Sequence, residues 1–210
     1  MNTLDEAAAK DLLAGYGIPV VQEARAADAQ QAVAAAERIG YPVVLKGIGA
    51  EFAHKTELGL VVLNLRDPQA VRAAAGRLLD TLAGRGELLV QRMVAGRREF
   101  LAGLSRDPQF GPVVTFGLGG IFAEALADVS FRVCPLSDAD AREMLDEIRG
   151  KALLGALRGL PAVDREVLVR TLAGLSRLAI ERPDIAAVDI NPLVVDGSQP
   201  VAVDALVVMG

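Results

Sequence analysis

The stretch that decides the fold is VVLKGIGAEFAHKTELG, residues 43–59. It begins with a β-branched and leucine-rich run at 43–46, which predicts a buried strand. A glycine-punctuated crossing then leads into a second such run at 58–65. The pattern therefore predicts two neighbouring strands joined by a long loop, a place where proteins commonly carry function.

The crossing contains His54, the only histidine of the chain, followed by Lys55. Imidazole can act as a base, a metal ligand or a nitrogen nucleophile near pH 7 without a large pKa perturbation. A solitary histidine is nevertheless more often a surface residue or a hydrogen-bonded structural residue. The segment alone leaves both interpretations open.

Helix and strand signals alternate outward from this stretch. Capping residues at Thr3, Asp28, Asp67, Ser137 and Asp164 predict the starts of helices. Apolar runs between turn residues predict further strands at 87–94, 99–104, 112–116, 131–135, 185–195 and 200–208. The alternation predicts an α/β (α+β) fold.

The spacing of these elements changes after Ala95-Gly96-Arg97-Arg98, where closely spaced strands replace the earlier alternation. We therefore expect two domains. Residues 1–94 would hold the N-terminal helix and a first lobe with the His54 loop, and residues 95–210 would form a second lobe with a metal and phosphate site.

Composition excludes several classes of partner. The 210 residues are 52% hydrophobic and 23% charged, and the net charge of −5 is spread along the chain, which argues against a nucleic-acid or membrane partner. The longest uncharged stretch, residues 108–123, is too short to span a bilayer and contains four glycines and two prolines. The acidic N-terminus predicts no secretion signal, and the single Cys134 permits no intrachain disulfide, so we expect a cytoplasmic protein.

The last two predicted strands contain polar residues at Asp189, Asn191 and Asp204, among valine, alanine, isoleucine and leucine neighbours. If these strands form an antiparallel hairpin, Asn191 and Asp204 could approach each other across it. One or two such oxygen ligands, completed by phosphates and water, are what Mg²⁺ uses in nucleotide sites. The alternative is that Asp189 caps a turn and Asp204 pairs with an arginine.

A glycine-rich segment, VTFGLGGIFAE, occupies residues 114–124. Glycines at this density allow backbone N–H groups to approach an anion closely, or they make a tight hairpin. The segment is not a dinucleotide-binding fingerprint, because Phe122 stands at the third glycine position, and the chain contains no GxxxxGK[ST] motif. A nucleotide site here would use neither of these common scaffolds.

Taken together, the segments resemble the ATP-grasp domain of nucleoside-diphosphate-forming acyl-CoA synthetases, the family of ADP-forming acetyl-CoA synthetase that is related to succinyl-CoA synthetase. The resemblance covers nearly the whole chain and is carried by residues 16–20, 40–46, 54–59, 117–124 and 189–193. It implies an ATP-grasp fold of two α/β lobes with the nucleotide between them.

The resemblance also implies roles for individual residues. Lys46 matches a phosphate-contacting lysine, and the hinge that would bind adenine matches 91–94, including Gln91, Met93 and Val94. Glu99 matches the acidic residue beyond that hinge. Gly117, Gly119 and Gly120 belong to the phosphate-binding segment, and Asn191 and Asp204 match Mg²⁺ ligands, so ATP or ADP with Mg²⁺ is expected.

His54 matches the histidine that accepts a phosphoryl group in this family, and Lys55 would hold that group electrostatically. The chain has no dinucleotide-type domain for CoA and no second histidine. The resemblance therefore implies a β-subunit whose separate α-subunit binds CoA and the acyl substrate.

One departure keeps alternatives open. The family commonly continues after the metal-binding aspartate with alanine and arginine, whereas Leu206 stands at the second of these positions. A catalytically silent, ATP-binding regulatory module would not be phosphorylated at His54. Another ATP-grasp carboxylate ligase would phosphorylate its substrate directly and would not need His54.

Overall fold

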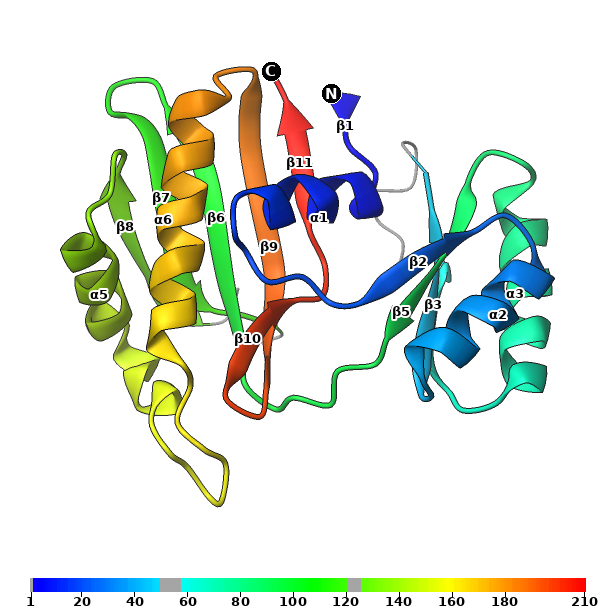
Figure 1. The fold of residues 1–210 in the computed structure, drawn as a ribbon. Helices are drawn as coiled ribbons and strands as arrows, with labels where there is room; N and C mark the ends of the chain where they lie inside the picture. Colours follow the sequence, from blue (N-terminus) through cyan, green and yellow to red (C-terminus); the bar gives the residue numbers. More distant parts are fainter. Residues whose placement is uncertain (1, 50–57, 121–125) are drawn as a thin grey trace. The chain divides into compact units, whose positions relative to one another are not determined.

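The computed structural model describes residues 2–49, 58–120 and 126–210. The contacts divide the chain into two compact units (Figure 1). The N-terminal unit consists of residues 5–7 and 21–94. The C-terminal unit consists of residues 1–4, 8–20 and 95–210.

The N-terminal unit is built on a four-stranded antiparallel sheet with the order β2-β5-β3-β4. Its strands are β2 (Glu23–Ala26), β3 (Val43–Ile48), β4 (Val61–Leu65) and β5 (Glu87–Arg92). The helices α2 (Ala29–Ile39) and α3 (Pro68–Leu82) pack against each other beside this sheet (Figure 1). Every residue of β3 is buried, as its continuous apolar run predicts.

The predicted helix starts in this unit are confirmed. The side chain of Asp28 accepts a hydrogen bond from the Gln31 N–H, and that of Asp67 accepts one from the Ala70 N–H, each at 2.8 Å. Pro68 then occupies the first turn of α3, where a missing N–H costs nothing.

The C-terminal unit contains a seven-stranded antiparallel sheet with the order β1-β11-β9-β6-β7-β8, and β10 also pairs with β9. These strands are β1 (Asn2–Thr3), β6 (Glu99–Asp107), β7 (Gly111–Leu118), β8 (Val129–Val133), β9 (Ile185–Asp196), β10 (Gln199–Ala202) and β11 (Leu206–Met209). The helices are α1 (Glu6–Gly15, whose first two residues belong to the N-terminal unit), α5 (Asp138–Glu147), the 3₁₀ helix η1 (Arg149–Leu154) and α6 (Arg165–Glu181).

Helices α5 and α6 cover one face of the β6-β7-β8 part of this sheet (Figure 1). The capping box at Ser137 and Asp140 and the cap at Asp164 start these two helices as predicted. Phe100 and Phe116 stack in the core with ring centroids 5.6 Å apart. Within the described ranges, no helix combines the length and apolar character that crossing a bilayer requires.

Arg98 joins two segments of the C-terminal unit, residues 153–161 and 195–199. Its side chain is buried, and its guanidinium group donates hydrogen bonds to four backbone carbonyls. The acceptors are Leu153 (3.1 Å), Gly155 (3.1 Å), Pro161 (2.7 Å) and Gly197 (3.1 Å). A side chain placed in this way substitutes for secondary structure, because carbonyls that are partly withdrawn from water need a donor.

Three expectations need correction. The predicted strand 200–208 is interrupted at 203–205, where the facing residue Pro192 of β9 has no N–H to donate to Val203. Thr3 does not cap a helix, since it pairs with Val208 in β1 and α1 begins at Glu6. Residues 1–4 and 8–20 do not belong with the first lobe, because Leu13 and Ile18 pack into the core of the C-terminal unit.

Candidate functional site

The break between β10 and β11 brings Asp204 level with Asn191. Ala202 lies opposite Leu193, and Leu206 lies opposite Asp189. Asp204 is two residues from both Ala202 and Leu206. On the facing strand β9, Asn191 is likewise two residues from both Leu193 and Asp189. The conditional prediction that these two side chains approach across paired strands therefore agrees with the register.

Strand β9 bulges at this point. Phe100 of β6 lies opposite Leu193, but Ala102 lies opposite Ile190, so β9 has one extra residue in this interval. A bulge redirects side chains near functional sites. Here the Oδ1 atom of Asn191 accepts a hydrogen bond of 3.2 Å from the Gly120 N–H. Because an amide oxygen has two lone pairs, it can bind a cation in addition.

The glycine segment packs directly against Glu99. The Gly119 N–H donates to the Glu99 carbonyl at 2.9 Å. A Cβ atom added to Gly120, whose φ is +65°, would stand 2.0 Å from the Oε2 atom of Glu99. Glu99, Gly119, Gly120 and Asn191 are thus brought together, whereas Gly117 packs against the backbone of Asp128 and Val129.

Replacing Gly119 by alanine is expected to destabilise this arrangement. The new Cβ would lie 2.4 Å from the Phe100 carbonyl oxygen. All of its nearest atoms belong to the Phe100 backbone, so the two backbone segments would have to move apart. Overpacking of this kind costs about 1–3 kcal/mol. Urea denaturation followed by circular dichroism measures the loss.

The matched control is Gly76→Ala in α3, where a Cβ meets nothing within 4 Å. It should stabilise the protein by about 0.5–1 kcal/mol, the helix-propensity difference. Equal effects of the two substitutions would contradict the close approach at Gly119.

The charge around Asn191 is negative. Loss of hydration, and then repulsion from Asp204, raise the pKa of Asp189 above its ordinary value. Across residues 2–49, 58–120 and 126–210, no group of three or more His, Cys, Asp or Glu side chains is placed to hold a metal. The donor set of one amide and one carboxylate oxygen, from Asn191 and Asp204, instead fits Mg²⁺, which takes its other ligands from phosphates and water.

Asp128 anchors the backbone beside the glycine segment, and no local sequence pattern indicates this role. Its backbone carbonyl accepts the Leu118 N–H at 3.1 Å. Its buried carboxylate accepts the N–H groups of Arg149 (2.8 Å) and Gly150 (2.7 Å). Burial alone would raise the pKa of Asp128, but these backbone donors lower it overall, so the group stays ionised.

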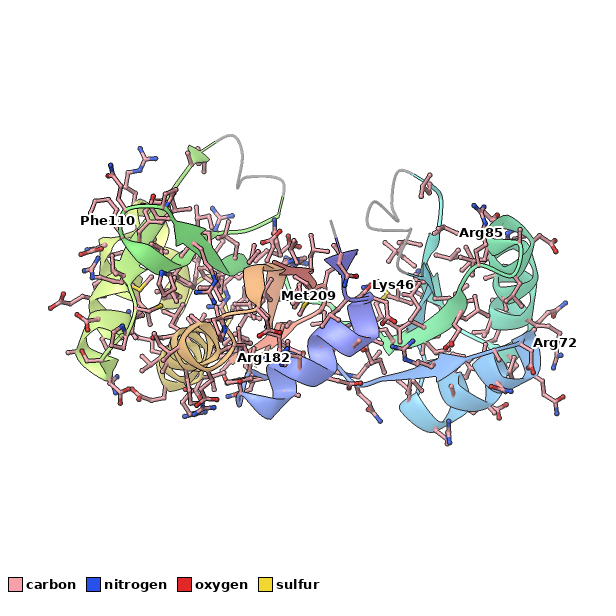
Figure 2. All side chains as sticks on the ribbon, turned by 90° about the horizontal axis from the view of Figure 1, so that it is seen from above. Lys46, Arg72, Arg85, Phe110, Arg182 and Met209 are labelled. Atoms are coloured by element: carbon pink, nitrogen blue, oxygen red, sulfur yellow. The ribbon has the colours of Figure 1, made fainter. Side chains whose placement is uncertain are left out.

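Lys46, labelled in Figure 2, lies on β3, one of the two inner strands of the N-terminal sheet, opposite Val61 on β4 and Leu89 on β5. Its Nζ atom donates a hydrogen bond of 2.6 Å to the Oε1 atom of Glu6, in the first turn of α1. The predicted phosphate-contacting lysine is therefore not an ordinary solvated strand-end residue.

The remaining predicted residues are placed as follows. Gln91 is buried on β5, opposite Val44 and Glu23 of the neighbouring strands. The Met93 N–H donates to the Pro42 carbonyl at 3.1 Å, so Met93 would contribute its carbonyl or side chain to any adenine contact. Val94 is the last residue of the N-terminal unit. His54 and Lys55 lie outside the described residues.

A family model described as an ATP-grasp domain matches residues 1–209. The β-subunit of an ADP-forming acetate–CoA ligase I from Pyrococcus furiosus is 39% identical over 212 residues, which cover 98% of this chain and 91% of that protein. The ADP-forming acetate–CoA ligase I of Archaeoglobus fulgidus is 37% identical over 205 residues. That match covers 95% of this chain but only 30% of the longer protein.

A solved structure from Ca. Korarchaeum cryptofilum is also similar. It is an acetyl-coenzyme A synthetase 1 in complex with coenzyme A and Mg-AMPPCP, with a phosphohistidine segment pointing towards the nucleotide-binding site. The TM-score is 0.88 at 38% identity, and the match covers 100% of this chain and 93% of that chain.

Proposed function

We propose that this chain, which belongs to the ATP-grasp domain family and to the ADP-forming acetate–CoA ligases, is the nucleotide-binding β-subunit of an ADP-forming acyl-CoA synthetase. The enzyme would interconvert acyl-CoA, ADP and phosphate with a carboxylic acid, ATP and CoA. We propose that the enzyme acts in the cytoplasm, where both ATP and CoA are available as substrates.

One observation carries the proposal. Glu99, Gly120 and Asn191 come from separate segments and lie together at a bulge of the C-terminal sheet, and the strand register sets Asp204 level with Asn191, which supports a metal site there. Such a set of oxygen donors suits a metal ion that carries a nucleotide phosphate. Mg²⁺ bound there would neutralise phosphate oxygens during transfer.

The residues of this chain then have defined tasks. The lone pair of an imidazole nitrogen of His54 would form the new N–P bond as the bond from the γ-phosphorus to the bridging oxygen breaks, and ADP would leave with that electron pair. Lys46 would offset negative charge on the transferring group. Lys55 would hold the phosphoryl group once it is on the histidine.

A partner would complete the reaction. The matched relative from Pyrococcus is a β-subunit, and in Archaeoglobus the matched region is part of a chain about three times longer. We propose that a separate α-subunit supplies CoA binding and the acyl chemistry. This chain alone would bind Mg-ATP and accept the phosphoryl group without making acyl-CoA.

The test is phosphorylation of the purified chain by γ-labelled ATP. The label should be acid-labile and alkali-stable, as phosphohistidine is, and it should return to added ADP as labelled ATP. Omitting Mg²⁺, or using α-labelled ATP, should give no bound label.

Two other results would point elsewhere. Mg-ATP binding without any label, with a candidate α-subunit present, would indicate the regulatory module. Label found only on a carboxylic acid substrate would indicate a carboxylate ligase that forms a free acyl phosphate.

A further inference from the structure

The buried ion pair between Glu6 and Lys46 is the feature of the N-terminal unit that the proposed reaction leaves unexplained. The Nζ–Oε1 distance is 2.6 Å, and the two side chains are only 1% and 8% exposed, for Glu6 and Lys46 respectively. The partners are 40 residues apart in sequence. Their contact therefore depends on the docking of the first turn of α1 against β3.

A pair of this kind is costly to keep. Both charges lose their hydration, and well-packed apolar residues of similar volume often stabilise a protein as well or better. Ala7 follows Glu6 in the chain and Leu89 lies opposite Lys46, and both belong with Ile48 to a small buried apolar cluster, so part of the surroundings is apolar. A functional role of the Lys46 ammonium group would explain why two charges are retained here.

The geometry points to Glu6 as a positioning residue for Lys46. We propose that the Glu6 carboxylate fixes the direction in which the Lys46 ammonium group points. An ammonium group has three N–H donors, so it can hold Glu6 and a phosphate oxygen at once. The inference rests on the proposed function, because it assigns Lys46 to the transferred phosphate.

A double-mutant cycle tests this coupling. Glu6→Gln removes the charge but keeps an acceptor of the same shape, and Lys46→Met removes the ammonium group. In the wild-type background, Glu6→Gln should slow single-turnover labelling by about 10–100-fold at saturating Mg-ATP, the scale expected for a misplaced catalytic group. The Kd for Mg-ATP, measured by calorimetry, should change much less.

In the Lys46→Met background, Glu6→Gln should have no further effect on the labelling rate, because its action passes through Lys46. An independent effect in that background would overturn the proposal. So would a Glu6→Gln variant that is less stable to urea but is labelled at the wild-type rate, since that result describes a purely structural pair.

The neighbouring residue provides a matched control. Asp5 forms an exposed ion pair with Arg25 at 2.7 Å, on the same segment of chain. Asp5→Asn should leave labelling and Mg-ATP binding unchanged. If Glu6→Gln does not fold, Glu6→Asp keeps the charge on a shorter side chain and should lower the labelling rate with the same dependence on Lys46.

The two proposals fail in different ways. A wild-type chain that binds no Mg-ATP and takes no label contradicts the proposed function. A wild-type chain that is labelled, with Glu6→Gln labelled equally fast, contradicts only the role of Glu6.

Discussion

His54→Ala is expected to abolish the acid-labile, alkali-stable label completely. The chain has a single histidine, so no second imidazole can take over the phosphoryl group. Covalent catalysis of this kind splits one difficult transfer into two easier ones, and removing the nucleophile removes both. The measurement compares γ-labelled ATP incorporation into the wild-type and variant chains, with and without a candidate α-subunit.

Nucleotide binding should survive this substitution, because the predicted phosphate and metal contacts come from other residues, among them Lys46, Asn191 and Asp204. The Kd for Mg-ATP therefore reports whether the variant is still folded at its site. Label that persists in His54→Ala would contradict the relay. If that label were alkali-labile, it would lie on an aspartate or glutamate as an acyl phosphate.

Much of the fold is readable from local sequence signals. The capping side chains Asp28, Asp67, Ser137 and Asp164 each find an N–H donor of the following helical turn. A cap needs only residues within one turn of itself, so short-range chemistry is sufficient to predict it. The same holds for the buried strand at 43–46, where a continuous apolar run leaves one interpretation.

Errors occur where long-range pairing overrides local preference. The run 200–208 reads as one strand, but it is interrupted at 203–205, where the facing strand β9 presents Pro192, which has no N–H. Thr3 has the local chemistry of a helix cap, yet its backbone is used in a sheet with Val208, over 200 residues away. No window of a few residues contains that information.

The candidate site shows the same division. Asn191 and Asp204 are detectable because polar residues are unusual in otherwise apolar strands. The contact of Glu99 with Gly120 depends on the register of β6 with β7, and Glu6 looks like any acidic residue in the first turn of a helix. Its pairing with Lys46 needs the tertiary structure.

Arg98→Met is expected to destabilise the C-terminal unit by about 3–5 kcal/mol. The substitution breaks four partly buried hydrogen bonds and leaves the carbonyls of Leu153, Gly155, Pro161 and Gly197 without their guanidinium donor. Each unsatisfied buried group costs about 1–3 kcal/mol, and partial access of water to these loops reduces the sum. Urea denaturation with and without Mg-ATP measures the change.

The control for Arg98 is its exposed neighbour, Arg97→Met, which should change stability by less than about 0.5 kcal/mol, as surface substitutions do. Arg98→Lys should lie in between, because an ammonium group cannot reproduce the planar fork that reaches four acceptors. Hydrogen exchange should rise first at 153–161 and 195–199, the loops that Arg98 joins. A loss no greater in Arg98→Met than in Arg97→Met would show that these loops hold their positions without Arg98.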